Sequence, residues 1–478
     1  MARIPKALKI LLFALGGLLG ILLLAALAVM LLVDSDAYKS RAEAAASDAS
    51  GMNVTVEGRL RIGVVSGLHV TLENVRIRNR GTEVAFVKEA VLAIELLSLL
   101  QPDLRYGSVV LNDVRISIER GRDGTYNYEK LPEAKETFPA LGVREVTFAD
   151  LIVAYADKAS GSSIESSGCR GELANMRHPG GAEFLSRVSL SGQFVCSEVR
   201  GKNATVSDFK FSVEATEGVF NFAPVTMRVF GGQGSGSARM DRSAAVPVLQ
   251  VSYSLSKFRV EDFFKVLAPG RSVHGLMDFS TTLSMRGRTR VELRRSANGE
   301  MSLSGMNLTL ADADLDKELL KYEPSQNFNL VDISAFLFAG PIGLAATKGY
   351  QFARLGQQNG GSTQIRTVVS KWKVEKGVAY AKDVAMATRE NRLALQGGLD
   401  FVDDKYDDVI VALIDSNGCA KVRQKISGPF SKPVVEKPGV LTSLAGPVLK
   451  LLSKARAILP GTRERCDVFY RGSVAPPK

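Results

Sequence analysis

The residue types that most often carry catalysis or bind metals are few and scattered in this sequence. Its 478 residues include 3 His and 4 Cys, and His69, His178 and His274 occur in separate contexts without a neighbouring Asp or Cys. Nucleophile–base pairs and metal sites need such groups close together, so we interpret these histidines as ordinary strand or loop residues. The glycine-rich run from Gly232 to Gly236 contains no intact GxSxG motif, and we expect it to form a turn.

The densest acidic cluster consists of Asp403, Asp404, Asp407 and Asp408. Carboxylates at this spacing can hold a divalent cation. The cluster lies between two apolar stretches, however, which favours a solvated hairpin loop. We therefore expect no catalytic residue, no metal site, no cofactor and no enzymatic activity.

The cysteines are Cys169, Cys196, Cys419 and Cys466, and none lies in a CxxC or Cys/His cluster typical of zinc sites. Four cysteines allow three pairings. Their order along the chain favours Cys169–Cys196 and Cys419–Cys466 as structural disulfides. Each would contribute roughly 3–4 kcal/mol on the chain-entropy account.

A membrane anchor is predicted at the N-terminus. Ile10 to Val33 contains no charged residue, and as a helix it would be about 36 Å long, enough to cross a bilayer core of about 30 Å. Basic residues precede it and Asp34 and Asp36 follow it, so residues 1–9 are expected in the cytoplasm. A cleaved signal peptide is the alternative, but its apolar core is usually about 7–15 residues. Residues 34–478 would then lie in an exported compartment where disulfides persist.

Short alternating runs predict a mainly β chain beyond the anchor. Val70 and Leu72 share one parity, whereas Val75 and Ile77 follow with the parity reversed. One inserted residue moves every later side chain to the other face, so we expect a β-bulge or tight bend at Asn74.

A short pattern recurs along the chain, in which Asn or Asp precedes an apolar-x-apolar sequence. Asn and Asp tolerate the backbone angles of a bend before a strand, and the recurrence suggests one strand unit used repeatedly. The pattern begins at Asn74, Asp113, Asp150, Asp208 and Asp383.

Few helices are expected among these strands. Short helical candidates are Ala42–Ala49, Val260–Leu267 and Asp314–Tyr322. Residues 441–459 show helical apolar spacing, with Lys450, Lys454 and Arg456 towards the other side. This basic amphipathic helix could lie on a membrane surface or cap an open end of the sheet, and the sequence does not separate the two.

Positive charge is concentrated at the C-terminus. The chain has a net charge of +11, and from Cys419 to Lys478 there are 12 Lys and Arg against 3 Asp and Glu, or 12 − 3 = +9. Such a segment suits an anionic surface, although it could also be a solvated end that adds solubility. The exported compartment excludes nucleic acid, so a lipid headgroup layer is the anionic partner expected.

Long antiparallel strands with little helix to cover them need an apolar partner for one face. A sandwich provides this by packing sheet on sheet, whereas a curved sheet can leave an apolar trough for a ligand. The sequence pattern alone favours a core. The residues that could serve either purpose are Val70, Leu72, Leu111, Val114, Ile116, Ile118, Leu151 and Val153.

Several segments resemble the AsmA family. They begin with the anchor and the stretch from Val33 to Lys39, and continue with 51–58, 67–75, 96–100 and 111–116. The resemblance includes Arg122–Asn127, which ends in an aromatic residue followed by Asn, and Gly428–Val434, which matches a Gly-x-Phe-x-x-Pro closing strand. It covers residues 1–130 and 280–440 well, while the region between Cys169 and Cys196 has no assignable counterpart.

This resemblance implies a single-pass protein of the inner membrane of a diderm bacterium, with most of the chain in the periplasm. Larger relatives form a repeating β-groove related to chorein-type lipid bridges. The implied function is binding and passing phospholipid between the inner membrane and the inner leaflet of the outer membrane, in support of outer-membrane assembly and lipid homeostasis. The alternative is an assembly factor that contacts outer-membrane assembly proteins without carrying lipid.

The expected fold class is therefore mainly β: one transmembrane helix, then a long curved antiparallel sheet with a few short helices. The expected regions are a tail (1–9), the anchor (10–33), an N-terminal groove region (34–160), a middle β region with a Cys pair (161–279), a C-terminal β region (280–440) and a basic helix with its tail (441–478).

Overall fold

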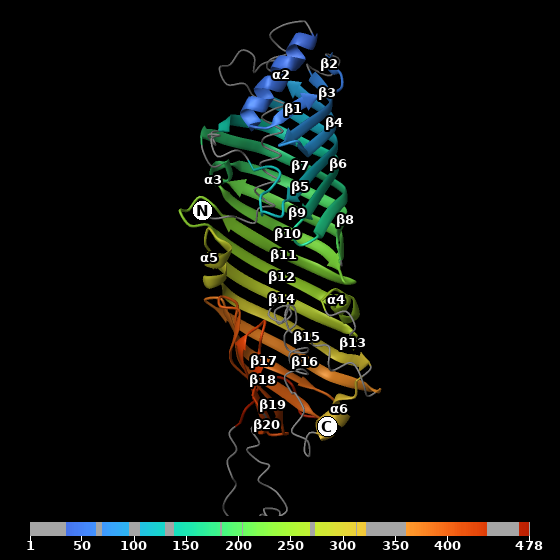
Figure 1. The fold of residues 1–478 in the computed structure, drawn as a ribbon, viewed down its shortest axis with the longest axis vertical. Helices are drawn as coiled ribbons and strands as arrows, with labels where there is room; N and C mark the ends of the chain where they lie inside the picture. The colour runs from blue at the N-terminus through green and yellow to red at the C-terminus, as the bar shows by residue number, and fades with distance from the viewer. Residues whose placement is uncertain are drawn as a thin grey trace, which may run out of the picture. The chain divides into compact units, whose positions relative to one another are not determined.

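A computed structural model shows a β-rich protein with few helices (Figure 1). The residues that it describes are 35–63, 69–94, 106–129, 138–181, 184–202, 204–267, 273–311, 313–321, 360–436 and 468–477. The expected anchor (10–33) and the basic helix with Lys450, Lys454 and Arg456 lie outside these residues. None of the helices in the described ranges has the length and apolar character needed to span a bilayer.

The elements follow in chain order. The first are α2 (Ser35–Ser50), β1 (Asn53–Val56), β2 (Leu60–Gly63), β3 (His69–Asn79), β4 (Thr82–Ile94), β5 (Tyr106–Arg120), β6 (Phe138–Asp157), β7 (Ser162–Gly181), α3 (Phe184–Arg187), β8 (Ser189–Gly201), β9 (Thr205–Thr216), β10 (Val219–Val229) and β11 (Gly232–Asp241). The later ones are β12 (Val248–Arg259), α4 (Val260–Leu267), β13 (Val273–His274), β14 (Leu276–Arg286), α5 (Arg290–Arg295), β15 (Asn298–Ala311), α6 (Leu315–Lys321), β16 (Ser362–Glu375), β17 (Val378–Ala387), β18 (Arg392–Asp400), β19 (Lys405–Ile414), β20 (Ala420–Pro429) and β21 (Val434–Val435).

The described strands are assigned to one sheet of 21 strands. Most neighbours in sequence are antiparallel partners, as from β6 to β10 and from β14 to β20. At the N-terminal end, β1 and β2 both pair with β3. The prediction of a mainly β chain with few helices is confirmed.

One strand pair departs from the antiparallel prediction. Strands β5 and β6 run parallel, with Val109 opposite Val146 and Ile116 opposite Val153. A parallel pair needs a connection that returns along the strands, and the connection after Arg120 begins with the Tyr126-Asn127 segment. The Asn127 amide group donates to Ser117 O at 2.8 Å and accepts from Glu119 N–H at 2.9 Å. The aromatic-Asn motif thus fastens the start of the crossover to β5.

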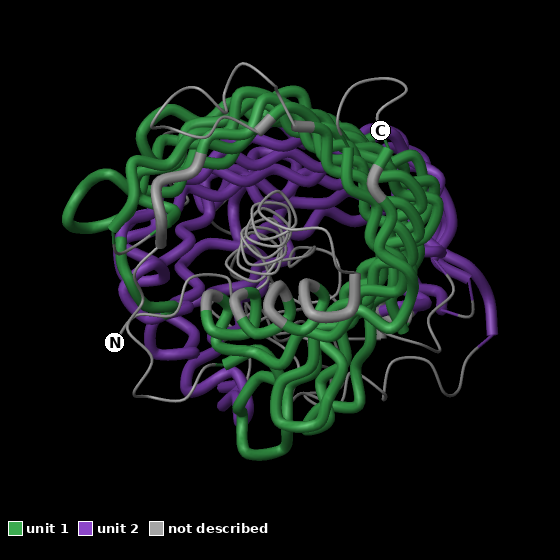
Figure 2. Tube along the Cα trace, turned by 90° about the horizontal axis from the view of Figure 1, so that it is seen from above, with its two compact units in different colours: residues 1–229, 234–251, 287–290 green, residues 230–233, 252–286, 291–478 purple. Residues whose placement is uncertain are grey.

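The chain divides into two compact units, coloured green and purple in Figure 2. Unit 1 consists of residues 1–229, 234–251 and 287–290, and its strands follow an arc when seen from above. Unit 2 consists of residues 230–233, 252–286 and 291–478.

A bend at a left-handed residue keeps one face of β3 apolar. In β3 the buried residues change from Val70 and Leu72 to Val75 and Ile77, and Asn74 between them has a φ of 54°. Glu73 and Asn74 are both half-buried, and neither belongs to the buried set. Asn74 is not an extra residue against β4, because Glu73 pairs with Glu89 and Val75 with Val87. Of the two predicted alternatives the tight bend is therefore the one found, and it keeps the apolar residues on one face although their parity changes.

The same conformation occurs at most positions of the recurring pattern. Positive φ values of 51–54° are found at Asn74, Asp113, Asp150 and Asp208. Asp383 differs, because it lies beside a register shift between β16 and β17 without a positive φ. Across β3 to β6 the register aligns Glu73 with Glu89, Asn112 and Ala149, so the bends at Asn74, Asp113 and Asp150 form one line across the sheet.

The short helices fall close to the predicted ranges, whereas the glycine run does not form the predicted turn. Residues 232–241 form β11, and its burial alternates, with Gly232, Gly234 and Met240 buried. Alternation of small or apolar residues with polar ones is the signature of a strand. This periodicity outweighs the low strand propensity of glycine.

Candidate functional site

The eight apolar residues singled out from sequence lie on one face of unit 1, which we call the inner face. They come from β3, β5 and β6 and belong to, or pack against, a single hydrophobic cluster. Seven of them have an exposed fraction of 4% or less, and Val153 is half-buried. The structure therefore brings them together, in a part of the inner face that is closed to solvent. Contact of these residues with lipid stays a prediction.

A row of phenylalanines continues the inner face across β6 to β10. We call Phe148, Phe194, Phe211 and Phe222 the aromatic ladder. Its ring centroids are 6.2 Å apart between Phe148 and Phe194, 5.0 Å between Phe194 and Phe211, and 6.0 Å between Phe211 and Phe222. Such spacings are favourable for aromatic pairs.

A glycine between two strands lets the ladder form. Gly171 of β7 lies opposite Phe148 on one side and Phe194 on the other. A Cβ atom at Gly171 would come within 2.4 Å of the Phe194 ring. The bare backbone at this position is therefore what allows the two rings to approach each other across β7.

The aromatic ladder opens to solvent along its length. The exposed fraction is 1% for Phe148 and 9% for Phe194, and Phe211 and Phe222 are half-buried against the same cluster. The inner face thus carries apolar side chains that are buried at β3 to β6 and, at Phe211 of β9 and Phe222 of β10, partly exposed.

Sequence reasoning missed the aromatic ladder. A signal was present in Phe209-Lys210-Phe211 and Phe220-Asn221-Phe222, where an aromatic residue recurs at strand period. Only the first of these segments was noted, and as part of the bend pattern rather than as one face of a strand.

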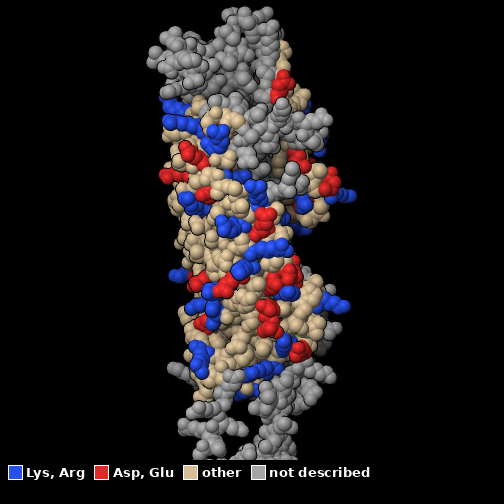
Figure 3. Space-filling model, turned by 90° about the vertical axis from the view of Figure 1, so that its left-hand side faces the viewer, with Lys and Arg blue, Asp and Glu red and all other residues tan. Residues whose placement is uncertain are grey.

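The opposite face of unit 1, the outer face, carries ion pairs between neighbouring strands. Arg76 bonds Glu57 at 2.8 Å and Glu83 at 2.5 Å, and both bonds raise the pKa of its guanidinium. Lys88 lies 2.7 Å from Asp113, which raises the pKa of the Lys88 amine. On the side of the molecule shown in Figure 3, basic and acidic side chains of the described residues are interspersed. Such exposed pairs contribute little stability, but they mark this face as the one in contact with water.

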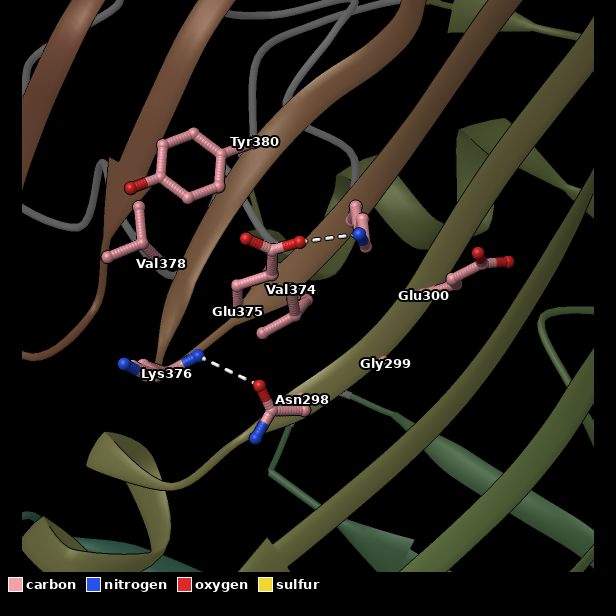
Figure 4. Close-up of a pocket in the computed structure, with 9 residues that line it drawn as sticks. Asn298, Gly299, Glu300, Val374, Glu375, Lys376, Val378 and Tyr380 are labelled. Carbon is pink, nitrogen blue, oxygen red and sulfur yellow. Dashed lines mark hydrogen bonds and ion pairs between the residues drawn. The ribbon is translucent and has the colours of Figure 1, made fainter.

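Unit 2 has a surface pocket of about 660 Å³ at the ends of β15, β16 and β17 (Figure 4). It is lined by Asn298, Gly299, Glu300, Lys373, Val374, Glu375, Lys376, Val378 and Tyr380. Lys373 and Glu375 form an ion pair of 2.5 Å, and burial, followed by the charge of Asp407, raises the pKa of Tyr380. Its lining residues form no nucleophile–base pair, so the geometry gives this pocket no catalytic constellation.

The acidic cluster at 403–408 forms the turn and start of a hairpin between β18 and β19, as predicted. Asp403 pairs with Lys405 at 2.9 Å and Asp408 with Lys425 at 2.8 Å. Among the residues that the structure describes, no group of three or more His, Cys, Asp or Glu is placed to hold a metal ion.

The first predicted disulfide is confirmed. Cys169 and Cys196 face each other on β7 and β8 with their Cα atoms 4.0 Å apart, and they are bonded. Cys419 is also disulfide-bonded. Its predicted partner Cys466 lies outside the described residues, so that pairing stays a prediction.

A C-terminal strap, residues 468–477, was not predicted. Its Phe469, Tyr470 and Val474 pack on alanines of β17 to β19 in a cluster of their own. The Tyr470 hydroxyl donates to Asp383 Oδ1 at 2.5 Å, and buried Arg392 donates to Val474 O at 2.9 Å. The available signal was the alternation of alanine with larger apolar residues in 384–387 and 393–395.

Comparison with known families fits this architecture. A model of the AsmA family matches residues 4–166 and 186–380, and the gap at 167–185 falls largely within the region between Cys169 and Cys196 that the sequence motifs left unassigned. The match does not extend to the closing strand around Phe430. No curated protein matches the chain. Enzymatic activity is not known for the AsmA family. Since the family match covers well over half of the sequence, the chain belongs to the AsmA family.

Proposed function

We propose that this protein binds phospholipid on its inner face and passes it between the inner and outer membranes of a diderm bacterium. It would be held by a single N-terminal span, with most of the chain in the periplasm, and would support outer-membrane assembly and lipid homeostasis. Membership of the AsmA family and the large sheet with one apolar face support this role.

The proposed mechanism is passive. Acyl chains lie against the inner face while headgroups stay in water. Each CH₂ kept from water saves about 0.8 kcal/mol, so the inner face lowers the barrier for a lipid to leave a bilayer. The chain needs no bond-breaking step for this, and the direction of transfer is set by a gradient or by a partner.

The observation that carries the proposal is the opening of the aromatic ladder. Phe211 and Phe222 pack against the buried cluster, but each ring remains partly exposed to solvent. Apolar surface that continues from a covered core into an uncovered stretch is typical of a ligand site. Aromatic rings offer a large contact area to acyl chains.

Site-specific photocrosslinking of the full chain in its native membrane tests the proposal. A photoreactive phenylalanine at position 222 reports on the inner face, and the same group at Asn221 is a matched control, because Asn221 is exposed. We expect lipid adducts at position 222 and at most background at 221. Equal lipid labelling at both positions, or none at 222 in a folded protein, would contradict lipid carriage.

The closed part of the inner face favours a second function. At β3 to β6 the apolar residues are buried as in an ordinary core, which suits an assembly factor that contacts outer-membrane assembly proteins without carrying lipid. In the same experiment, protein adducts at outer-face positions together with an absence of lipid at 222 would favour this function.

A further inference from the structure

Helix α2 contacts, through polar side chains, the edge of β1 that pairs with no other described strand. Ser47 Oγ accepts a hydrogen bond from Val54 N–H at 3.0 Å, and Glu43 Oε1 accepts one from Val56 N–H at 2.6 Å. Strand β1 pairs with β3 on its other side. These two N–H groups therefore belong to the edge that would otherwise be open to another strand.

A third contact extends the series by one helical turn. Lys39 Nζ donates to Gly58 O at 3.2 Å, so Lys39, Glu43 and Ser47 act from one helix face at four-residue spacing. Four residues of helix advance about 6 Å, and two residues of strand advance about 6.6 Å. The side chains of α2 thus match the repeat of alternate backbone groups along the edge, as a neighbouring strand would.

The described contacts of α2 with β1 are mostly polar. From Lys39 to Ser50 the helix contains no apolar residue larger than alanine, and among its described side chains Ala46 is buried in the unit 1 cluster. Net gains from individual hydrogen bonds are modest because water competes for both partners. At the end of α2, Gly51 has a φ of 66° and its N–H donates to Ser47 O at 2.8 Å. This tight turn joins α2 to β1, so a helix released from the edge would remain tethered beside it.

We propose that α2 is a detachable cap over a strand-accepting edge, and that the partner admitted when it detaches is an extended β-strand of another polypeptide. Backbone N–H groups at alternate positions are what an added strand binds. Val54 and Val56 are themselves buried in the cluster, so the edge is fixed in register and ready to pair. The inference is independent of lipid carriage.

Hydrogen exchange on the full chain tests detachment. The double variant Glu43→Ala/Ser47→Ala removes both acceptors and keeps the helix, because alanine favours helix formation. Asp48→Ala, at an exposed position of the same helix, is the control. We expect the amides of Val54 and Val56 to exchange at least tenfold faster in the double variant, with β4 and β5 unchanged. Unchanged exchange at both amides, or equal acceleration throughout β3 to β5, would overturn the proposal.

Binding of a synthetic peptide tests strand acceptance. The peptide of residues 69–79 is the natural partner sequence of β1, and a version N-methylated at alternate residues cannot form the edge hydrogen bonds. We expect the unmodified peptide to bind the double variant at least tenfold more tightly than it binds the unmodified chain or the Asp48→Ala control. Equal binding to all three proteins, or equal binding of both peptides, would refute a strand-accepting edge.

Discussion

In unit 1, strands β6 to β10 keep one face apolar, buried in part, and carry polar and charged residues on the other, whereas strands β17 to β19 of unit 2 each contain a segment buried on both faces. Four consecutive residues are buried in each of these three strands of unit 2, at 384–387, 392–395 and 411–414. In unit 1 the pattern alternates, as in β3, where buried and half-buried residues take turns. The two regions share strand architecture and differ in what covers them.

The cover on one face of β17 to β19 is the C-terminal strap. Ala385, Ala394 and Ala412 lie opposite one another on neighbouring strands, and their small side chains leave room for Phe469 and Tyr470. The cover is also bonded through polar groups, since Gln396 Nε2 donates to Phe469 O at 2.6 Å. This region is therefore a closed core.

This difference in burial separates strands that only stabilise the fold from strands that could also bind a ligand. A strand buried on both faces contributes to stability and offers no binding surface, whereas an apolar face that loses its cover along the sheet can receive a ligand. The aromatic ladder lies at that transition in unit 1. Substitutions matched between covered and uncovered positions can therefore distinguish a structural role from a binding role.

The largest effect is expected from a charge in the covered part of unit 1. Val114→Asp would place a carboxylate at a position with 1% exposure, and we expect a loss of at least ~4 kcal/mol of unfolding free energy. Val153→Asp, at a half-buried position, should cost about 1–2 kcal/mol and leave a folded protein. Denaturation followed by hydrogen exchange in β4 to β7 measures both. Equal effects of the two variants would remove the distinction between fully buried and half-buried positions of the inner face.

Truncation of one phenylalanine in each region comes next. Phe469→Ala in the strap should cost about 3–5 kcal/mol, because it empties a buried site. Phe222→Ala should cost about 1–2 kcal/mol, because part of the ring is already exposed, and it should reduce lipid recovered with the full chain. Exchange rates in β17 to β19 and lipid extraction provide the two measurements. If Phe469→Ala reduced the lipid recovered and Phe222→Ala did not, the strap would be the binding region and the aromatic ladder a structural one.

Much of the fold could be predicted because alternation and bend residues are local signals. The bend at Asn74 follows from the parity change between Val70 and Ile77, and the pairing of Cys169 with Cys196 from their order along the chain. The parallel pairing of β5 with β6 could not be read in this way, because strand direction depends on the path of the crossover between them.

The candidate site was predicted only in part. Residues such as Leu72 and Ile116 were placed on one face correctly, but parity does not tell whether a face is covered. Cover depends on segments far away in sequence, as with the strap, which bonds Asp383 across 87 residues. The opening at Phe222 depends likewise on what the rest of the chain leaves uncovered.

A smaller effect is expected from the polar group that fixes the strap. Burial raises the pKa of Asp383, but hydrogen bonds from Ser473 and Tyr470 outweigh it and hold this pKa below the usual 3.8. The carboxylate thus stabilises the fold above about pH 4, and this contribution is lost as the pH falls through the lowered pKa. Tyr470→Phe removes one donor and leaves Val474 N–H without its acceptor, which should cost about 1–3 kcal/mol at pH 7.

The control for Tyr470→Phe is to measure its effect on unfolding free energy at a second, acidic pH. The difference in unfolding free energy between Tyr470→Phe and the unmodified chain should be smaller at about pH 2 than at pH 7, because protonated Asp383 no longer gains from the missing donor. Urea unfolding of both proteins at the two pH values, followed by hydrogen exchange in β17 to β19, measures this difference. A difference that does not change with pH would mean that Tyr470 acts through packing alone.

The smallest effect concerns the bulges that keep the inner face apolar. Asp150 has a φ of 54°, and a β-branched side chain is strained at this angle. Asp150→Val should therefore cost about 1–2 kcal/mol, whereas Asp150→Gly should stay within about 0.5 kcal/mol because glycine adopts positive φ without strain. Thermal unfolding compares the two. If the strain is relieved by a shift of register instead, Leu151 and Val153 would leave the inner face together, and exchange in β6 would rise far more than the loss of stability accounts for. The bulge at Asp150 would then determine which face of β6 is apolar. The same test is not possible in β17 to β19, where segments are buried on both faces.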